Sequence, residues 1–329
     1  MKKLLLIEKL CPGDSLMLTA AVRELKQKYP DYHIDVISPH PEIWANNPYI
    51  SPLNWKRDLT SKELTVEDDT HIINVDYTKA INSSNQRPYH FIHGYCQNLE
   101  DRLNLKIRVS SFQGEVFLTK EEAKDNIASK FGWTDKYWLI NSGGKYDAST
   151  KWSSPKYYQE VVDHFKNKIQ FIQIGKLGDW HLPLRGAINC IGKTSIRDLI
   201  KLTYNAQGIL CPVTFLMHLS KAVPINKTIH QFDIRPTVVI NGGRESATWE
   251  KYEGHKFLDT IGTMDCCKSG GCWKNHVIQI GDKKENLCTY PVDSGNELFI
   301  AKCMMNITPK RIIDSIESYF ENGLIEYLN

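Results

Sequence analysis

The chain has 329 residues, enough for two domains with separate cores, and the composition of an ordinary globular protein. Its net charge of +3 is too small to demand nucleic acid or an anionic membrane as a partner. No apolar run approaches the roughly 20 residues of a membrane span, and the apolar segment before Glu8 is shorter than the ~7–15 residues of a signal core. These features argue against a membrane-spanning protein and predict a cytoplasmic one.

The N-terminal segment predicts a strand, a helix and a second strand. The first strand is Lys3–Glu8, an apolar run typical of a strand buried on both faces, and the second is Ile34–Ile37. Between them, Leu16–Tyr29 places apolar residues at helical spacing. A single crossover implies a parallel sheet, in which functional groups collect beyond the carboxyl ends of the strands. Gly13 and Asp14 lie at that point, so Asp14 is the first candidate for a functional residue.

Asp14 also has a purely structural interpretation. Asp and Ser are preferred at helix starts, where their side chains accept hydrogen bonds from free backbone N–H groups. From these residues alone, capping by Asp14 or Ser15 is the simpler interpretation.

The remainder of the first half predicts short elements joined by loops. Pro88–Leu103 has helical spacing, and its His90, His93 and Tyr95 are expected to be core residues or, alternatively, residues on the acceptor side, with the core favoured. Thr119 starts a capping box, Thr-Lys-Glu-Glu, so a second helix should begin there and end near Gly132. The other expectations are a loop with short pieces of structure at Ser38–Asp58, a buried strand at Thr70–Val75, a surface loop at Tyr77–Arg87 and a strand at Glu115–Leu118.

The second half alternates strands with helices, which predicts a second parallel sheet. The strands are Tyr137–Asn141, Phe171–Gly175, Ile209–Cys211 and Thr237–Asn241. The helices are Tyr157–Phe165 (with Pro155 in its first turn), Ile196–Thr203, Thr214–Ala222 and a last helix from Pro309 to about Glu321. We therefore expect a domain at residues 1–134, a second at 135–308 and a C-terminal helix at 309–329.

The segment Gly13-Asp14-Ser15-Leu16, followed by Thr19 and Leu25, resembles the opening of the family 9 glycosyltransferases. These are the heptosyltransferases of lipopolysaccharide cores and their relatives. The resemblance implies the GT-B fold, in which two Rossmann-like parallel-sheet domains face a cleft. It also implies an acceptor site in the first domain, a sugar-nucleotide site in the second, and Asp14 as the catalytic base. Ala20 stands where the family usually has proline.

Two stretches of the second half carry candidate phosphate-binding groups. Ser142-Gly143-Gly144 is a glycine turn at the end of a strand, and such turns offer N–H groups to a diphosphate. Lys151-Trp152 resembles the family's Lys-x-Trp element, whose lysine meets the phosphates. The alternative for Lys151 is a solvated surface lysine. Gly175, which follows a strand, matches the family's glycine beside the nucleotide.

The stretch Cys211–Ala222 resembles the family's Asp-Thr-Gly-x-x-His element, which holds the donor. Thr214 and His218 match it, whereas Val213 replaces the aspartate and Phe215 the glycine. The chain must therefore replace the carboxylate contact or do without it. The helix start from Thr214 to His218 would still present N–H groups to phosphate. The alternative for His218 is a core histidine.

Arg244 follows a strand in the sequence Asn-Gly-Gly-Arg-Glu. Its guanidinium group is suited to bidentate phosphate binding. An equally good interpretation is that Arg244 pairs with Glu245 and only fixes the loop.

Five of the nine cysteines lie within 38 residues: Cys266, Cys267, Cys272, Cys288 and Cys303. In a cytosolic protein this favours metal over disulfides, and four thiolates suffice for a closed tetrahedral site. We therefore expect a structural zinc or iron ion, held by Cys272, Cys288, Cys303 and one of Cys266 and Cys267. Some iron-containing relatives in the family have a four-cysteine site in this half. The alternative is a group of reduced buried thiols.

The resemblance implies an inverting glycosyltransferase that moves a sugar, with ADP-heptose as the suggested donor, to an acceptor hydroxyl. The acceptor is not specified by the sequence and is a saccharide, a protein or a nucleic acid. No organic cofactor is expected. A nucleotide-sugar epimerase of similar fold is one alternative, although no second carboxylate beside the sugar stands out. An inactive, metal-stapled binding protein is the other, favoured by Val213 and Phe215.

Overall fold

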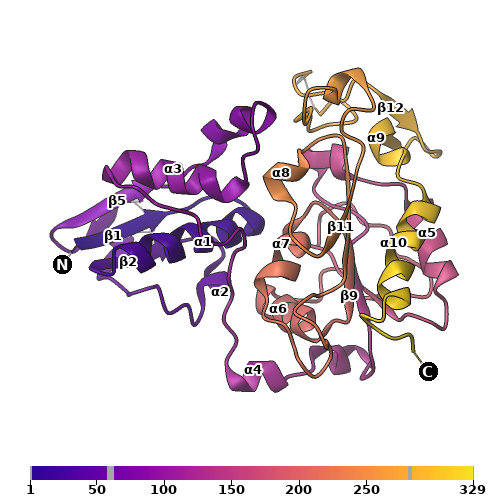
Figure 1. Ribbon diagram of the computed structural model, residues 1–329, viewed down its shortest axis with the longest axis horizontal. Helices are drawn as coiled ribbons and strands as arrows, with labels where there is room; N and C mark the ends of the chain where they lie inside the picture. The colour runs from indigo at the N-terminus through magenta and orange to yellow at the C-terminus, as the bar shows by residue number, and fades with distance from the viewer. Residues whose placement is uncertain (1, 58–62, 281–283, 329) are drawn as a thin grey trace.

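The computed structural model describes residues 2–57, 63–280 and 284–328, and these form two α/β halves placed side by side (Figure 1). The first half contains a parallel three-stranded sheet with the order β2-β1-β5. Its strands are β1 (Lys2–Ile7), β2 (Tyr32–Ile37) and β5 (Thr70–Asn74). The helices α1 (Pro12–Lys28) and α3 (Phe91–Leu103) contact each other. The predicted strand, helix and strand at the N-terminus are confirmed.

The second half is built on a parallel six-stranded sheet with the order β11-β10-β9-β6-β7-β8. The expected strands correspond to β6 (Trp138–Ile140), β7 (Phe171–Gln173), β9 (Gly208–Pro212) and β10 (Thr237–Gly242). The expected helices are α5 (Pro155–His164), α6 (Ile196–Asn205), α7 (Phe215–Ala222) and α10 (Pro309–Glu321). The last of these packs against α5, so the C-terminal helix belongs to this half (Figure 1).

Several short elements were not located individually by the sequence pattern, although α2 and β3 fall in the loop where short pieces of structure were expected. In the second half they are β8 (Ile188–Asn189), α8 (Ala247–Glu250), β11 (His255–Asp259), β12 (Pro291–Asp293), β13 (Phe299–Ala301), α9 (Lys302–Met305) and the 3-10 helices η3 (Tyr146–Lys151) and η4 (Asp265–Cys267). In the first half they are α2 (Pro41–Trp44), β3 (Trp55–Arg57) and β4 (Leu64–Val66). Most have three to five residues, too few to show a periodicity.

The first half also corrects three predictions. β5 is an edge strand with Ile72 exposed, because it has only β1 as a neighbour. The segment expected as a surface loop contains the 3-10 helix η1 (Thr78–Asn85). No strand forms at Glu115–Leu118; there the chain runs along α1, and the N–H of Glu115 donates to the Thr19 hydroxyl oxygen at 2.8 Å.

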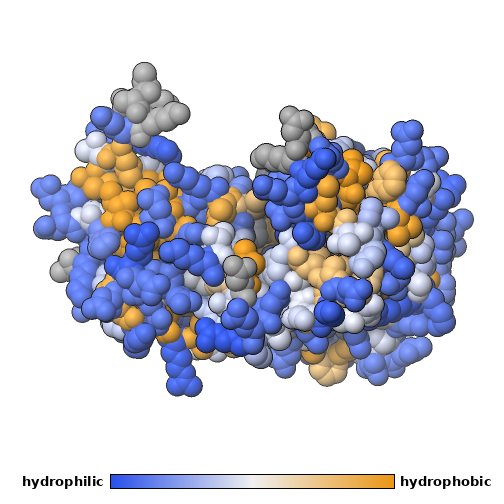
Figure 2. Space-filling view, turned by 90° about the horizontal axis from the view of Figure 1, so that it is seen from above, coloured by the Kyte–Doolittle hydropathy of each residue, from blue (hydrophilic) through white to orange (hydrophobic). Residues whose placement is uncertain are grey.

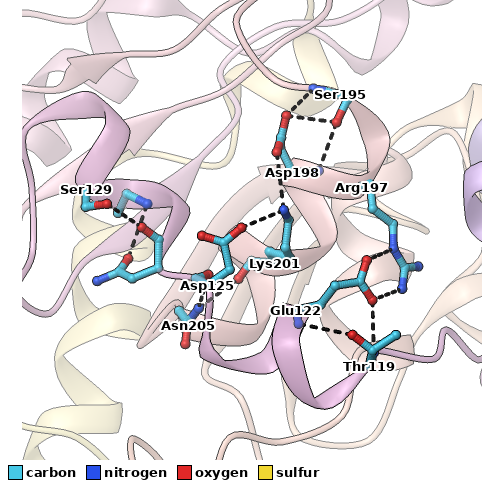
Figure 3. A network of polar contacts seen from close by, with 11 residues as sticks. Thr119, Glu122, Asp125, Ser129, Ser195, Arg197, Asp198, Lys201 and Asn205 are labelled. Carbon is cyan, nitrogen blue, oxygen red and sulfur yellow. Dashed lines mark hydrogen bonds and ion pairs between the residues drawn. The ribbon is translucent and has the colours of Figure 1, made fainter.

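The chain between the halves is fixed to α6 by a polar network (Figure 3). The helix predicted from Thr119 is split into α4 (Lys120–Lys124) and η2 (Ile127–Phe131), and its capping box is present. Arg197 on α6 donates to both carboxylate oxygens of Glu122 on α4. Lys201, one turn later, forms an ion pair with Asp125 at 2.8 Å. These charged contacts hold the connection between the halves against the second sheet's helices.

From above, hydrophobic side chains gather mainly in one patch on each half (Figure 2). In the described part of the chain, no helix has the length and apolar character needed to cross a membrane.

Candidate active site

The N-termini of α1 and α7 meet where the two halves face each other (Figure 1). A Cβ atom added at Gly13 would lie 3.2 Å from Cδ2 of His218 and 3.8 Å from Cα of Phe215. A side chain at position 13 would therefore press on the ring of His218, and glycine allows the close approach of α7. This contact brings three of the predicted site residues together.

Asp14 is held by hydrogen bonds on both carboxylate oxygens. The N–H of Cys11 donates to Oδ2 at 2.9 Å, and the hydroxyl of Tyr77 donates to Oδ1 at 2.9 Å. Burial raises the pKa of Asp14, while these two bonds and the nearby Lys151 and Lys145 partly oppose the rise. The predicted capping role is real, and the same contact fixes the carboxylate at the meeting point of the two helices.

Tyr77 is a site residue that the sequence analysis missed, since it lay in a segment expected to be a polar loop. Its ring packs against Phe91 at 4.2 Å and Trp249 at 6.2 Å between ring centres. Burial raises the pKa of Tyr77 far above its ordinary value, and the negative charge of Asp14 adds to the rise. Tyr77 therefore remains a hydrogen-bond donor to Asp14.

Lys151 points into the same region from η3. Its Nζ forms an ion pair with Oε1 of Glu245 at 3.0 Å. Burial, reinforced by the nearby Arg244, lowers the pKa of Lys151 to about 8. The neighbouring Trp152 is buried and stacks on Trp180 at 4.4 Å. Lys151 is thus a partly buried cation rather than a solvated one, and Trp152 is part of the packed interior.

The glycine turn at Ser142–Gly144 is occupied by the chain itself. The N–H of Gly143 donates to Oδ1 of Asn141, and the N–H of Gly144 donates to the carbonyl of Trp180 at 2.9 Å. The Ser142 hydroxyl oxygen accepts from Gln173. In this conformation both N–H groups are paired, Gly143 with the preceding Asn141 and Gly144 with the later Trp180, so they are not free. The phosphate-binding role of this turn stays a prediction.

Trp180 and His181 explain why glycine is needed at the ends of β6 and β7, since a Cβ atom at Gly143 would clash first with the carbonyl oxygen of Trp180. A Cβ atom at Gly143 would lie 2.6 Å from Nδ1 of His181, and one at Gly175 would lie 2.5 Å from Nε2. Neither ring nitrogen has a hydrogen-bond partner among the described residues. Burial lowers the pKa of His181. This neutral ring beside the strand ends had no signal in the sequence.

The start of α7 lacks a side-chain cap. Thr214 is the N-cap residue, but its hydroxyl donates to the carbonyl of Pro212 at 3.3 Å rather than accepting from an N–H group. His218, one turn later, is buried, and its Nδ1 lies 2.6 Å from the hydroxyl oxygen of Tyr252. Burial lowers the pKa of His218 to about 3, so the ring is neutral.

Arg244 serves mainly to fix its loop. It forms an ion pair with Glu245, and it donates to the carbonyl of Lys274 at 2.8 Å and to Oδ1 of Asn275 at 2.6 Å. Burial lowers its pKa. Of the two interpretations of this arginine, loop fixation is the one that the contacts support.

A second buried carboxylate, Glu250, lies in the same region. Its Oε2 is 3.7 Å from Nε2 of His218, and this atom has no hydrogen-bond partner among the described residues. Burial raises the pKa of Glu250; Lys151 and Arg244 oppose the rise, and Asp14 adds to it. A second carboxylate that did not stand out in the sequence therefore lies close to Asp14. Glu250 ends a four-residue helix, too short to be noticed in the sequence.

The five clustered cysteines approach one another around the end of β10. A Cβ atom at Gly243 would lie 3.0 Å from Sγ of Cys267 and 3.4 Å from Cβ of Cys303. Burial raises the pKa of Cys303 to about 12, and the neighbouring thiols add to the rise. All nine cysteines are free, and within the described residues no three His, Cys, Asp or Glu side chains are arranged to hold a metal ion. The expected four-thiolate site is thus not formed.

Three solved structures match over 98% of this chain, each at 14% sequence identity. A family 9 glycosyl transferase from Veillonella parvula matches over 97% of its chain (TM-score 0.62), and ADP-heptose LPS heptosyltransferase II from E. coli over 99% (TM-score 0.61). The iron-containing dodecameric glycosyltransferase TibC from enterotoxigenic E. coli matches over 77% of its chain (TM-score 0.62). This chain has the fold of the family 9 glycosyltransferases.

The predicted GT-B fold is therefore confirmed, although neither a protein-family model nor a curated protein matches the sequence. At 14% identity the likeness concerns the fold. The roles of the individual site residues stay predictions, supported by the geometry described above.

Proposed function

We propose that the protein is an inverting glycosyltransferase that moves a sugar from a nucleoside-diphosphate sugar to an acceptor hydroxyl. The observation that carries the proposal is the position of Asp14. Its carboxylate is anchored at the start of α1, directly opposite the start of α7 and within electrostatic range of Lys151. A base and a diphosphate-binding cation thus share one site between the two halves. The proposal keeps domains at residues 1–134 and 135–308 and a terminal helix at 309–329.

The proposed reaction has one displacement step. Asp14 accepts the proton of the acceptor hydroxyl while the acceptor oxygen bonds to the anomeric carbon of the donor sugar. The bond from that carbon to the diphosphate oxygen breaks on the opposite face, so the configuration inverts. Lys151 and the uncapped N–H groups of α7 stabilise the negative charge of the departing nucleoside diphosphate. The raised pKa of Asp14 makes it a stronger base than an exposed aspartate.

ADP-heptose is the donor that the structural relatives support best. One of them is named as an ADP-heptose heptosyltransferase, and TibC has been solved in complex with ADP-D-β-D-heptose. In this chain, the diphosphate would take over Lys151 from Glu245, with which it is paired. The acceptor is a saccharide, a protein or a nucleic acid, and cytoplasmic location stays a prediction.

Glu250 is the observation that favours the epimerase alternative. An epimerase needs a second acid or base beside the sugar, and Glu250 is a buried carboxylate whose charge acts on Asp14. The binding-protein alternative rests on Val213 and Phe215, which depart from the family pattern at the start of α7.

Incubation with a panel of nucleotide sugars separates the three functions. We expect release of the nucleoside diphosphate from an ADP-sugar in the presence of acceptor-containing extracts, with label from the sugar entering the acceptor fraction. Conversion of the nucleotide sugar to its epimer, without release of diphosphate, would identify an epimerase. Binding with neither reaction would identify a binding protein.

Elemental analysis tests the predicted metal separately. About one zinc or iron ion per chain in freshly purified, chelator-free protein would mean that the thiols converge in solution, most directly Cys272, Cys288 and Cys303. A metal-free sample would leave all five as ordinary reduced thiols, in agreement with their arrangement here.

A further inference from the structure

We propose that Glu250 binds the transferred sugar of the donor, with its carboxylate accepting hydrogen bonds from the sugar hydroxyl groups. This inference rests on the proposed function, because it assigns one part of the same site. Strand β9 leads into α7 through Val213, so the start of α7 has no carboxylate from its own segment. Glu250 supplies one from a different element, α8.

Glu250 is held at the boundary between the halves. The preceding residue, Trp249, stacks on Phe91 of the first half with ring centres 5.2 Å apart, and it packs edge-on against Trp273. These aromatic contacts fix α8 in place. The carboxylate of Glu250 consequently faces His218, with Oε2 3.7 Å from Nε2, beside the place where α1 and α7 meet.

The carboxylate has hydrogen-bonding capacity that the chain does not use. Glu250 is only 4% exposed, yet its Oε2 accepts no hydrogen bond from any described residue. A buried oxygen in this state is costly, and buried polar groups in native proteins nearly always have partners. A ligand that donates hydrogen bonds would remove this cost.

The surrounding charges indicate which ligand group fits. Glu245 already pairs with both cations near Glu250, Lys151 and Arg244, and Asp14 adds a second carboxylate close by. A further anion beside Glu250 is therefore unfavourable, whereas a neutral, hydroxyl-rich group is favoured. The diphosphate fits better at Lys151 and the N-terminus of α7, where positive charge and N–H groups are concentrated.

Both the ribose and the transferred sugar of a nucleotide sugar carry such hydroxyls, and the position of Asp14 decides between them. In the proposed reaction the base lies next to the anomeric carbon of the transferred sugar. Glu250 lies 3.7 Å from Nε2 of His218, and Gly13, the neighbour of Asp14, packs against the same ring, so the two carboxylates approach His218 from opposite halves. We therefore assign Glu250 to the transferred sugar.

Titration calorimetry of wild type and Glu250→Gln with ADP and with ADP-D-β-D-heptose tests this assignment. Glutamine has the same size but offers one neutral acceptor oxygen. Hydrogen bonds to charged groups are worth enough that we expect the sugar nucleotide to bind roughly 10–100-fold more weakly. The affinity for ADP should change by less than about threefold, since ADP lacks the transferred sugar. Glu253→Gln, an exposed change three residues later, should alter neither affinity.

Each other outcome has a distinct meaning. If wild type binds ADP-heptose and Glu250→Gln binds it equally well, Glu250 does not contact the sugar, although the proposed function stands. If Glu250→Gln and Glu250→Asp lose ADP affinity as much as sugar-nucleotide affinity, Glu250 supports the whole cleft and the assignment is also wrong. If wild type binds neither ligand, the proposed function itself fails.

Discussion

The N-terminus of α1 is capped by the side chain of Asp14, a residue of that helix. The N-terminus of α7, which faces it, has no side-chain cap. At α1, Asp14 accepts from the N–H of Cys11 and is further held by Tyr77. At α7, the Thr214 hydroxyl donates to a carbonyl, and the N-cap side chain does not satisfy the first N–H groups of the helix. The two helix starts share one site, but α1 presents a carboxylate there, whereas α7 presents backbone N–H groups without a side-chain cap.

This difference assigns complementary roles to the two helices. The capped start positions a carboxylate, and the positive end of the helix dipole favours its ionised form. The uncapped start leaves N–H groups and a partial positive charge for an anionic ligand. α4 and α6 are also capped, by Thr119 and Ser195, and both lie in the network that joins the halves (Figure 3). We therefore expect the carboxylate at the start of α1 and the backbone N–H groups at the start of α7 to matter for function. Changes to the capping side chains of α4 and α6 should affect stability alone.

Asp14→Asn should have the largest effect. The amide keeps the shape of the side chain but cannot accept the proton of the acceptor, so turnover should fall by about 10²–10⁴-fold. Affinity for ADP should be nearly unchanged. Steady-state transfer rates and calorimetry measure the two effects, with the exposed Asp31→Asn as a control. A normal transfer rate in Asp14→Asn would show that another group acts as the base.

Lys151→Ala should weaken ADP and donor binding together. It removes a partly buried cation that acts on Asp14 and on His218 of α7, and a hydrogen bond to a charged group corresponds to roughly 10–100-fold in affinity. Lys156→Ala, an exposed change on the following helix, is the matched control. If Lys151→Ala binds ADP as tightly as wild type, Lys151 does not bind the diphosphate, and its role is limited to the ion pair with Glu245.

Tyr77→Phe should shift the pH dependence of activity by a smaller amount. Asp14 must be ionised to act as a base, so activity falls as the pH drops through its pKa. That pKa is already raised by burial, and the Tyr77 hydroxyl lowers it by hydrogen bonding to the carboxylate. Removal of the hydroxyl should move the acid limb of kcat/KM to higher pH and cost a few-fold in rate at the lower end of the range. An acid limb at the same pH would separate Tyr77 from the ionisation of Asp14.

Local sequence patterns predicted the features of the two halves that depend on residues close together in the sequence. The position of Asp14 followed from the strand, loop and helix around it, and the capping box at Thr119 followed from four consecutive residues. The periodic strands and helices of both sheets were predicted for the same reason. The burial predicted for β5 failed because this strand lies at the edge of the sheet and pairs only with β1. The strand predicted at Glu115–Leu118 failed because this segment runs along α1, with a hydrogen bond to Thr19, instead of pairing with a strand.

Contacts between distant segments could not be predicted in this way. Tyr77 reaches Asp14 across 63 positions of sequence, and Glu250 reaches His218 from a helix of four residues. The glycine turn at Gly143–Gly144 had the right local chemistry for phosphate, but Trp180 paired with its N–H and C=O groups. The spacing of the cysteines, likewise, did not determine where their thiols would point.

The smallest effect on function is expected for Thr119, which caps α4 in the segment that connects the two halves. Thr119→Ala removes the side-chain oxygen that accepts from the N–H of Glu122 at 3.2 Å, and loss of such a cap costs about 1 kcal/mol in the free energy of unfolding. Thr214→Ala should cost less, because that hydroxyl does not cap α7. Neither change should alter ADP affinity, since the N–H groups of α7 remain. Denaturant unfolding and calorimetry of the two variants measure this directly. An equal loss of stability in Thr214→Ala would mean that α7 depends on Thr214 for capping, and the contrast between the helix starts would then fail.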